Sequence, residues 1–446
     1  MNKTTFGLDN TSQSLEKIIH GLIYLYIMSI SFQTLGLGFI SLHISLPEIV
    51  FIILVPFTII HIIRSGQKIW IDKIDLFVFG WLIATIIVGW HAGFDSIIAT
   101  EIIKTAYLVV LYVVLKWTIK PVMIEKIVKV IILSSLVSAL TGIIGFGLEY
   151  FGIATNLAIK RPFPYLIEKV IQAKGFAPTP NMLASIIMIG IFFQIQTLSM
   201  TQINSKGKDI MVLLIMLLGF SLTFSKTITC LFIGIILLLY LNYKLTCSYT
   251  WRLATRVSVT GLFIIYMIGT HFIFVERNQD SGLLKGDYIS GSVLIETDNY
   301  SVYPSQYWSL KEISFEAIHH SFPWGLGPGK FNGFAHEFKK NDINPTHVPH
   351  PDPHSTYLGT LAENGLLGLI AFSGIIYFVI NYSRKILHNY SSNQFILACL
   401  PSIFIVIGIE AISTDVMNFR HAWVLLIFLV FNYQYLKSIS SKSLNL

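Results

Sequence analysis

Residues 209–243 read DIMVLLIMLLGFSLTFSKTITCLFIGIILLLYLNY. A membrane-crossing helix needs about 20 apolar residues, so this block is too long for a single crossing. After Asp209, the only charged residue in the block is Lys226. We therefore predict a turn at Lys226 between two spans, at 209–225 and 226–243. This turn decides the fold, because joining the two spans into one would invert the orientation of every later segment.

The composition of the whole chain also indicates a membrane protein. Of its 446 residues, 54% are hydrophobic and only 12% are charged, whereas soluble proteins carry about 25% charged residues. These values exclude a soluble multidomain protein and a disordered chain. The net charge is +7, but the basic residues lie in short loops between apolar runs, so we expect no nucleic-acid partner. The fold class is therefore an all-α polytopic membrane protein.

Apolar runs predict about twelve transmembrane helices and a large extracytoplasmic loop. The predicted spans cover residues 18–40, 44–63, 74–91, 98–119, 122–148, 181–198, 209–225, 226–243, 254–275, 365–382, 394–413 and 420–437. With the N-terminus inside, 18 of the 31 basic residues fall in inner segments, and the short outer loops at 41–45 and 92–97 carry none. This alternation follows the positive-inside rule and places both termini in the cytoplasm.

The spans divide the chain into three parts. Residues 1–275 contain helices one to nine with an outer segment at 149–180, residues 276–364 form the large outer loop, and residues 365–446 contain the last three helices. Long loops in a compact protein usually carry function. Within the large loop, apolar residues at helical spacing predict an amphipathic helix over 306–319, either lying on the membrane or capping the bundle.

The outer loop is rich in histidine. Six of the thirteen histidines lie between His319 and His354, and His347, His350 and His354 share the stretch HVPHPDPHS. Their loose spacing, the intervening prolines and the lack of a nearby cysteine disfavour zinc, so we expect no metal site and no cofactor. His354 precedes Ser355, a favourable residue for a helix N-cap. At that boundary His354 could take a proton from a hydroxyl, or it could simply form a hydrogen bond within the loop.

A glycine cluster precedes this histidine. Gly325, Gly327 and Gly329 lie in FPWGLGPGKF. Since no strand precedes them and no GKS or GKT sequence follows, a dinucleotide fold and a P-loop are excluded. The spacing favours a tight turn after the 306–319 helix.

Cations at the outer edge of the membrane form a further group of candidates. Lys226 interrupts an apolar block, where a charge is costly unless it faces a cavity or a ligand, so we favour a functional interpretation. Lys174, Arg161 and Arg420 also map to outer ends. Snorkelling of long side chains is the alternative, and for Arg161 it is the favoured one.

The stretch HSTYLGTLAENGLLG resembles the signature of the O-antigen ligase and polymerase family of bacterial envelope glycosyltransferases. In this sequence the matching positions are His354, Ser355, Gly365 and Gly368, with Glu363 inside the motif. The GLGPGKF turn at 325–331 is also similar to the family. So are GFAPTPNMLA at 175–184, with its Pro180-Asn181 pair, and the Ser-Lys-Thr break. The resemblance covers about residues 175–385.

The resemblance implies a GT-C-like membrane enzyme that transfers glycans without a metal. The donor would be an oligosaccharide or polysaccharide on undecaprenyl diphosphate, and the acceptor a sugar hydroxyl on lipid A-core or on another lipid-linked glycan. His354 would be the base that activates this hydroxyl in an inverting reaction. The protein would be a multi-pass protein of the bacterial inner membrane, surrounded by membrane lipids, with its active-site loop in the periplasm.

The resemblance also implies a diphosphate site. Lys174 and Lys226 fall where family members tend to have arginines, and Asn181 belongs to a neighbouring motif. Lysine is a point charge, whereas arginine offers a planar bidentate contact to phosphate. Arg161 or Arg420 could then supply the missing bidentate contact.

Three functions remain to be compared. The motif around His354 favours a ligase, and the lysines in place of arginines disfavour it. We predict ligase-type transfer, with a polymerase that uses the same donor as the alternative. A lipid-linked glycan flippase or transporter is the third alternative, because Glu101, Lys104 and Glu410 are charged residues within predicted spans. The large outer loop with its histidine and glycine turn disfavours transport.

Overall fold

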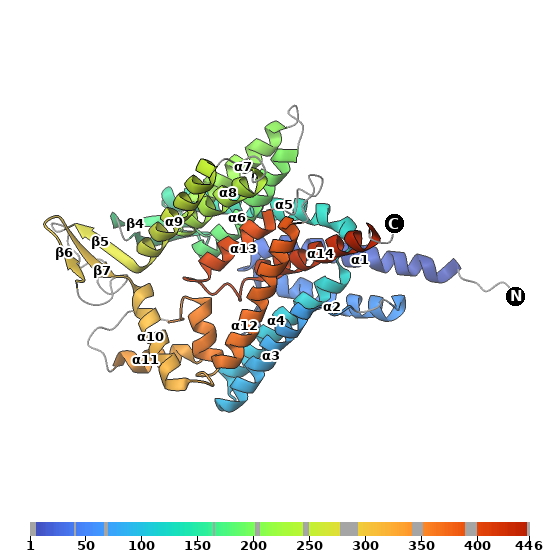
Figure 1. Ribbon diagram of the computed structural model, residues 1–446, viewed down its shortest axis with the longest axis horizontal. Helices are drawn as coiled ribbons and strands as arrows, with labels where there is room; N and C mark the ends of the chain where they lie inside the picture. The colour runs from blue at the N-terminus through green and yellow to red at the C-terminus, as the bar shows by residue number, and fades with distance from the viewer. Residues whose placement is uncertain are drawn as a thin grey trace.

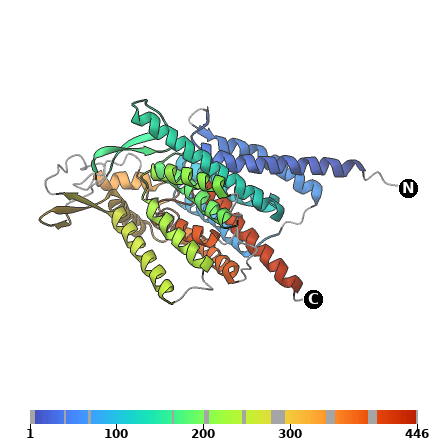
Figure 2. The same ribbon diagram turned by 90° about the horizontal axis from the view of Figure 1, so that it is seen from above.

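The computed structural model describes residues 6–39, 42–66, 70–163, 166–200, 206–243, 249–276, 293–340, 351–388 and 399–443. Helices form an elongated bundle in which α1 and α14 reach one end, and short strands with α10 and α11 occupy the other (Figures 1 and 2). We refer to the latter as the strand end.

Each of the twelve predicted spans overlaps a helix. These helices are α1 (Phe6–Ser29), α2 (Leu46–Ser65), α3 (Lys73–His91), α4 (Ser96–Thr118), α5 (Ile124–Tyr150), α6 (Pro180–Met200), α7 (Lys206–Ser221), α8 (Thr227–Tyr243), α9 (Tyr249–His271), α12 (Thr356–His388), α13 (Cys399–Glu410) and α14 (Arg420–Ser443). Short 3-10 turns η1 (Ile30–Phe32) and η2 (Pro121–Met123) follow α1 and precede α5. Among the described residues, eight helices are long and apolar enough to cross a membrane, and α8 and α13 are shorter. A polytopic helical membrane protein is thus confirmed, while the count of twelve spans stays a prediction.

The connections at the strand end contain antiparallel strands that the sequence did not indicate. The strands are β1 (Gly36–Phe39), β2 (Leu42–Ser45), β3 (Ala158–Phe163), β4 (Leu166–Ala173), β5 (Phe272–Glu276), β6 (Ile295–Glu296) and β7 (Tyr300–Pro304). β1 pairs with β2 and β3 with β4, and the third sheet has the order β5-β7-β6. The amide of Thr34 donates to Phe176 O (2.9 Å), which ties the α1–α2 connection to the segment that follows β4.

The chain turns at Lys226, as predicted. Near the far end, the Gln194 side chain of α6 donates to Asp209 O of α7 (3.0 Å). At the strand end, Ser225 Oγ donates to Asn181 Oδ1 at the start of α6 (2.9 Å). α6 and α7 are therefore antiparallel, and α8 leads away from the strand end again.

The amphipathic helix predicted over 306–319 is α10 (Gln306–Ser321). It caps the bundle, because its apolar face is buried in a small core shared with α11 (Phe331–Lys340) and the start of α12. That core contains Leu310, Ile313, Ala317, Phe331, Ala335 and Ala362.

A break in α12 receives the glycine turn. Gly365 has φ 57° and ψ −154° inside the helix, a conformation that glycine adopts without the penalty of a side chain. The amide of Leu366 donates instead to Pro323 O (2.8 Å), and the amide of Gly327 donates to Glu363 O (3.0 Å). A Cβ atom at Gly365 would lie 2.3 Å from Pro323 O. The two glycine motifs are therefore two halves of one packing contact that orients the start of α12.

Candidate active site

His354 lies immediately before α12 in a strained backbone conformation. Its φ is +40°, in the left-handed region that non-glycine residues rarely adopt. Asp352 Oδ1 accepts the His354 amide (2.6 Å) and lies 3.1 Å from Nδ1 of its ring. Ser355 caps the helix, as predicted, since its Oγ accepts from the Leu358 amide (3.4 Å). Strain of this kind persists only where the surroundings impose it, and it is frequent at active sites.

The helix start is fixed from the other side by the segment between α13 and α14. The amide of Thr356 donates to Ala411 O (2.8 Å), and its hydroxyl donates to Thr414 O (2.9 Å). The same hydroxyl oxygen accepts from the Val416 amide (2.9 Å). These bonds hold the backbone that carries His354, so its imidazole has a defined position.

Tyr307, on the first turn of α10, contacts both His354 and Lys226. Its ring centroid is 5.0 Å from that of His354 and 4.0 Å from Lys226 Nζ. Lys226 follows a second strained residue, Phe224, with φ 46°. Three segments that are far apart in the sequence thus bring an imidazole, an aromatic ring and an ammonium group together.

A second lysine joins this group. Lys226 Nζ donates to Thr270 O (3.3 Å) at the end of α9, and Lys311 Nζ contacts Nε2 of the neighbouring His271. Within the described residues, no carboxylate lies within ion-pair distance of either lysine. Burial, helped by the charge of Lys311, lowers the pKa of Lys226 to about 7, and burial lowers the pKa of Lys311 to about 8. Two adjacent, poorly solvated cations favour an anionic ligand.

Residues 211–373 match a family model described as O-antigen ligase. This match shows similarity to the O-antigen ligase family over 163 of the 446 residues. It confirms the resemblance over the segment that contains Lys226, Lys311 and His354, and it supports glycan transfer in O-antigen biosynthesis. No curated protein matches the chain.

Two predicted site residues outside the O-antigen ligase match lie beside the matched part. The amide of Ala173 donates to Leu222 O (2.9 Å), which places the neighbouring Lys174 next to the α7–α8 turn. Asn181 accepts a hydrogen bond from Ser225, directly before Lys226. The structure therefore brings Lys174 and Asn181 to the strand end together with Lys226, and Asn181 helps to fix the turn.

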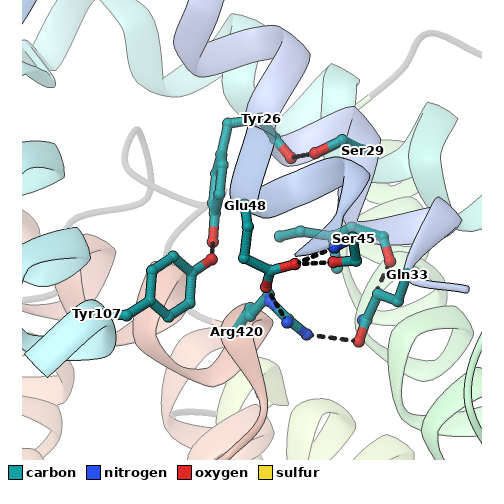
Figure 3. A network of polar contacts seen from close by, with 8 residues as sticks. Tyr26, Ser29, Gln33, Ser45, Glu48, Tyr107 and Arg420 are labelled. Atoms are coloured by element: carbon teal, nitrogen blue, oxygen red, sulfur yellow. Dashed lines mark hydrogen bonds and ion pairs between the residues drawn. The ribbon is translucent and has the colours of Figure 1, made fainter. Parts of the chain in front are cut away.

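Arg420, at the start of α14, belongs to a separate network (Figure 3). Its guanidinium contacts Glu48, and its Nη1 donates to Gln33 Oε1 (2.8 Å). The other oxygen of Glu48 accepts from the Ser45 amide (2.9 Å), so the carboxylate also caps α2. Arg420 thus has an internal carboxylate partner, unlike Lys226. Arg161 lies in β3, opposite Val170, and its side chain is outside the described part of the chain.

The remaining residues of the O-antigen ligase motif support the site. Glu363 Oε1 accepts from the Phe331 amide (3.3 Å) and so joins α12 to the start of α11. Gly368 lies one helical turn after Asn364, against whose Cβ an added methyl group would clash at 2.4 Å. Gly325 and Gly329 lie in the turn that packs on the α12 break. His347 and His350 are outside the described residues, so their role as polar loop residues stays a prediction.

Sequence reasoning missed three residues of this site: Tyr307, Lys311 and Asp352. Tyr307 and Lys311 are four residues apart on the predicted amphipathic helix, so they share a face. That spacing, with a cation and an aromatic ring on one face of a helix in the functional loop, was the available signal. Asp352 stands two residues before His354, but a contact across a strained turn leaves no periodic pattern.

Proposed function

We propose that this protein transfers a glycan from undecaprenyl diphosphate to a sugar hydroxyl, with inversion, at the outer face of the bacterial inner membrane. The termini would be cytoplasmic and the active-site loop periplasmic. One observation carries the proposal: the ring of Tyr307 contacts both the candidate base His354 and the candidate leaving-group cation Lys226. Glycosyl transfer from a diphosphate needs these two functions at neighbouring positions.

His354 would act as the general base. The Asp352 carboxylate would accept a hydrogen bond from Nδ1–H of His354, and this tautomer leaves Nε2 as the basic nitrogen. Nε2 then takes the proton of the acceptor hydroxyl while its oxygen forms a bond to the anomeric carbon. The bond from that carbon to the diphosphate oxygen breaks in the same step, and this single displacement inverts the anomeric centre.

Lys226 and Lys311 would stabilise the departing undecaprenyl diphosphate. Fixed cations accelerate a reaction when negative charge develops beside them. These two lysines would supply the positive charge without a metal ion. Lys174, at the neighbouring turn, is a third candidate. Arg420 would first have to leave Glu48, and Arg161 would have to reach the site from β3, so the two lysines are favoured over both arginines.

Transport is disfavoured as the principal function. Its support came from charged residues within spans, and two of these, Glu101 and Lys104, form an ion pair with each other on the surface of α4 (2.6 Å). Glu410 Oε2 accepts a hydrogen bond from Ser185 (3.1 Å) inside the bundle. The ion pair accounts for Glu101 and Lys104 without a transported ion, whereas Oε1 of Glu410 is buried with no partner among the described residues.

The acceptor distinguishes a ligase from a polymerase. We propose lipid A-core, and therefore ligase-type transfer, with a polymerase acting on a second lipid-linked glycan as the alternative. Deletion of the gene tests this choice. Loss of a ligase leaves long glycan chains on undecaprenyl diphosphate and bare lipid A-core, whereas single repeats attached to lipid A-core in the deletion strain would overturn the ligase assignment. Complementation with the His354→Ala variant should fail in either case.

A further inference from the structure

The exposed face of α10 is divided lengthwise into an aromatic and a polar stripe. Trp308, Phe315 and Phe322 are seven residues apart. At this spacing each side chain is rotated around the helix axis by only about 20° from the previous one. Their exposed fractions are 39%, 61% and 62%. Phe322 follows the last helical residue, but its amide still donates to Ile318 O (2.9 Å), so it keeps the helical register. The aromatic stripe is therefore continuous along the helix.

The polar stripe lies beside it. Glu312, Glu316 and His320 are exposed at four-residue spacing on the adjacent part of the surface. Trp308 Nε1 donates to Glu312 Oε1 (2.5 Å), which ties the two stripes together at one end. Large aromatic side chains beside a charged row on one helix are typical of a helix that lies at a membrane–water interface.

The ends of α10 touch the ends of two helices that can cross the membrane. At its start, Trp308 packs on His271, the last residue of α9, with ring centroids 6.4 Å apart. Just beyond its end, Trp324 packs on His91, the last residue of α3, at 4.7 Å. A helix of 16 residues is about 24 Å long. α10 and the residues just beyond it therefore bridge the ends of α9 and α3 at the strand end of the bundle.

Exposed aromatic residues also occur at the end of α3. Trp90 and Phe94, which flank His91, are 80% and 57% exposed, and Trp324 is 45% exposed. The preceding turns of α3 expose Ile83, Ile86 and Ile87, as expected of a helix in contact with lipid. Tryptophan and other aromatic residues are enriched where such helices enter the interface.

We propose that this surface, the aromatic stripe of α10 together with Trp90, Phe94 and Trp324, inserts into the lipid interface at the strand end of the bundle. Its partner is the bilayer itself, and the proposal stands independently of the proposed reaction. The insertion holds α10 at a fixed depth in the interface, with its polar stripe toward water. Since Tyr307 and Lys311 lie on the same helix, their depth is fixed as well.

Spin labels on the full-length protein test this proposal. Cysteines at Phe315 and Phe322 probe the aromatic stripe, and cysteines at Glu316 and His320 are the matched controls on the polar stripe. The parent protein, into which each labelling cysteine is introduced singly, carries Cys247→Ser and keeps the two buried cysteines, Cys230 and Cys399. Each protein is reconstituted into vesicles of phosphatidylethanolamine and phosphatidylglycerol. Collisions of the label with oxygen, which is enriched in lipid, are then compared with collisions with a water-soluble nickel chelate.

We expect the logarithm of the oxygen-to-nickel collision ratio to be positive at 315 and 322 and negative at 316 and 320. Equal ratios at the four positions would overturn the proposal, because the two stripes would then face the same environment. Labels at 315 and 322 that are shielded from both reagents would also overturn it, since protein rather than lipid would cover the stripe. Elution of each labelled protein at the volume of the parent establishes that the fold is intact.

Discussion

Two lysines in apolar surroundings, Lys116 and Lys226, differ in one respect. Lys116 is 2% exposed, forms an ion pair with Asp75 and lies 3.9 Å from the centroid of the Trp70 ring. Tyr112 donates to the other oxygen of Asp75 (2.7 Å). Lys226 also lies on an aromatic ring, at 4.0 Å from Tyr307, but the described residues place no carboxylate beside it. One ammonium is neutralised by the protein and the other is not.

This difference separates a structural cation from a binding cation. Lys116 and Asp75 join α4 to α3, and no charge is left for a ligand. Lys226 and Lys311 lie beside a strained turn, and a ligand would have to supply the negative charge. A half-buried cation without a carboxylate partner costs folding free energy, so Lys226 and Lys311 are candidates for a role in binding rather than in folding. The predictions below test this contrast.

The largest expected effect is that of His354→Ala on glycan transfer. Removal of a general base typically lowers the rate by roughly 10²–10⁴-fold. The rate is measured with purified protein, lipid-linked donor and lipid A-core, and the thermal unfolding midpoint should stay at the wild-type value. His336→Ala is the matched control, since His336 is exposed on α11, and it should leave the rate unchanged. A His354→Ala protein with wild-type turnover would make His354 a structural residue.

Breaking the ion pair of Lys116 should reduce stability and not turnover. Lys116→Met leaves Asp75 without its cation, and breaking a buried pair costs about 3–5 kcal/mol. The double variant Asp75→Leu/Lys116→Met removes both charges and should recover most of that loss. Unfolding of the purified proteins measures the stability, and activity per folded molecule should stay near wild type in both. If the single variant unfolds like wild type but loses activity, the contrast with Lys226 is wrong.

Substitution of Lys226 or Lys311 should show the opposite pattern. Lys→Gln removes a preorganised charge, which typically costs roughly 10²–10³-fold in rate, while stability should be unchanged or slightly higher. Lys→Arg keeps the charge and should retain most of the activity. Similar behaviour of the Gln and Arg variants at both positions would show that charge is irrelevant there, and the diphosphate site would then have to involve Lys174, Arg161 or Arg420.

Local patterns in the sequence were sufficient for the helices. Apolar run length located the twelve helical ranges, the single charge at Lys226 located the turn between α7 and α8, and Ser355 located the start of α12. Each of these features depends on residues close together in the chain. Periodic spacing likewise predicted α10 as an amphipathic helix.

The contacts that complete the site could not be obtained in this way. Tyr307 meets His354 and Lys226 only because three distant segments converge at the strand end. The pairing of Arg420 with Glu48 joins α14 to α2, nearly the full length of the chain apart. The strands at the strand end are short and carry no clear alternation of apolar and polar residues, so hydropathy did not distinguish them from loops.

The smallest expected effect is a pH dependence that the two lysines impose. The folded-state pKa values of about 7 for Lys226 and about 8 for Lys311 lie below the ordinary value of about 10.4. At pH values between the folded-state and the ordinary pKa, the folded protein binds fewer protons than the unfolded chain. The free-energy cost that the two lysines impose on folding therefore falls as pH rises. The binding site behaves in the opposite way, because it loses its positive charge as pH rises through 7 to 8.

We therefore expect kcat/KM for the lipid-linked donor, which reports on the free enzyme, to fall between pH 7 and pH 9. Arginine stays protonated over this range, so the double variant Lys226→Arg/Lys311→Arg should lose the alkaline fall while keeping the acidic limb of the profile. Asp75→Leu/Lys116→Met is the control, and its profile should follow that of the wild type. An alkaline fall that persists in the double arginine variant would assign the titration to another group. The charge of Lys226 and Lys311 would then not be available to the ligand, and these lysines would no longer differ from Lys116.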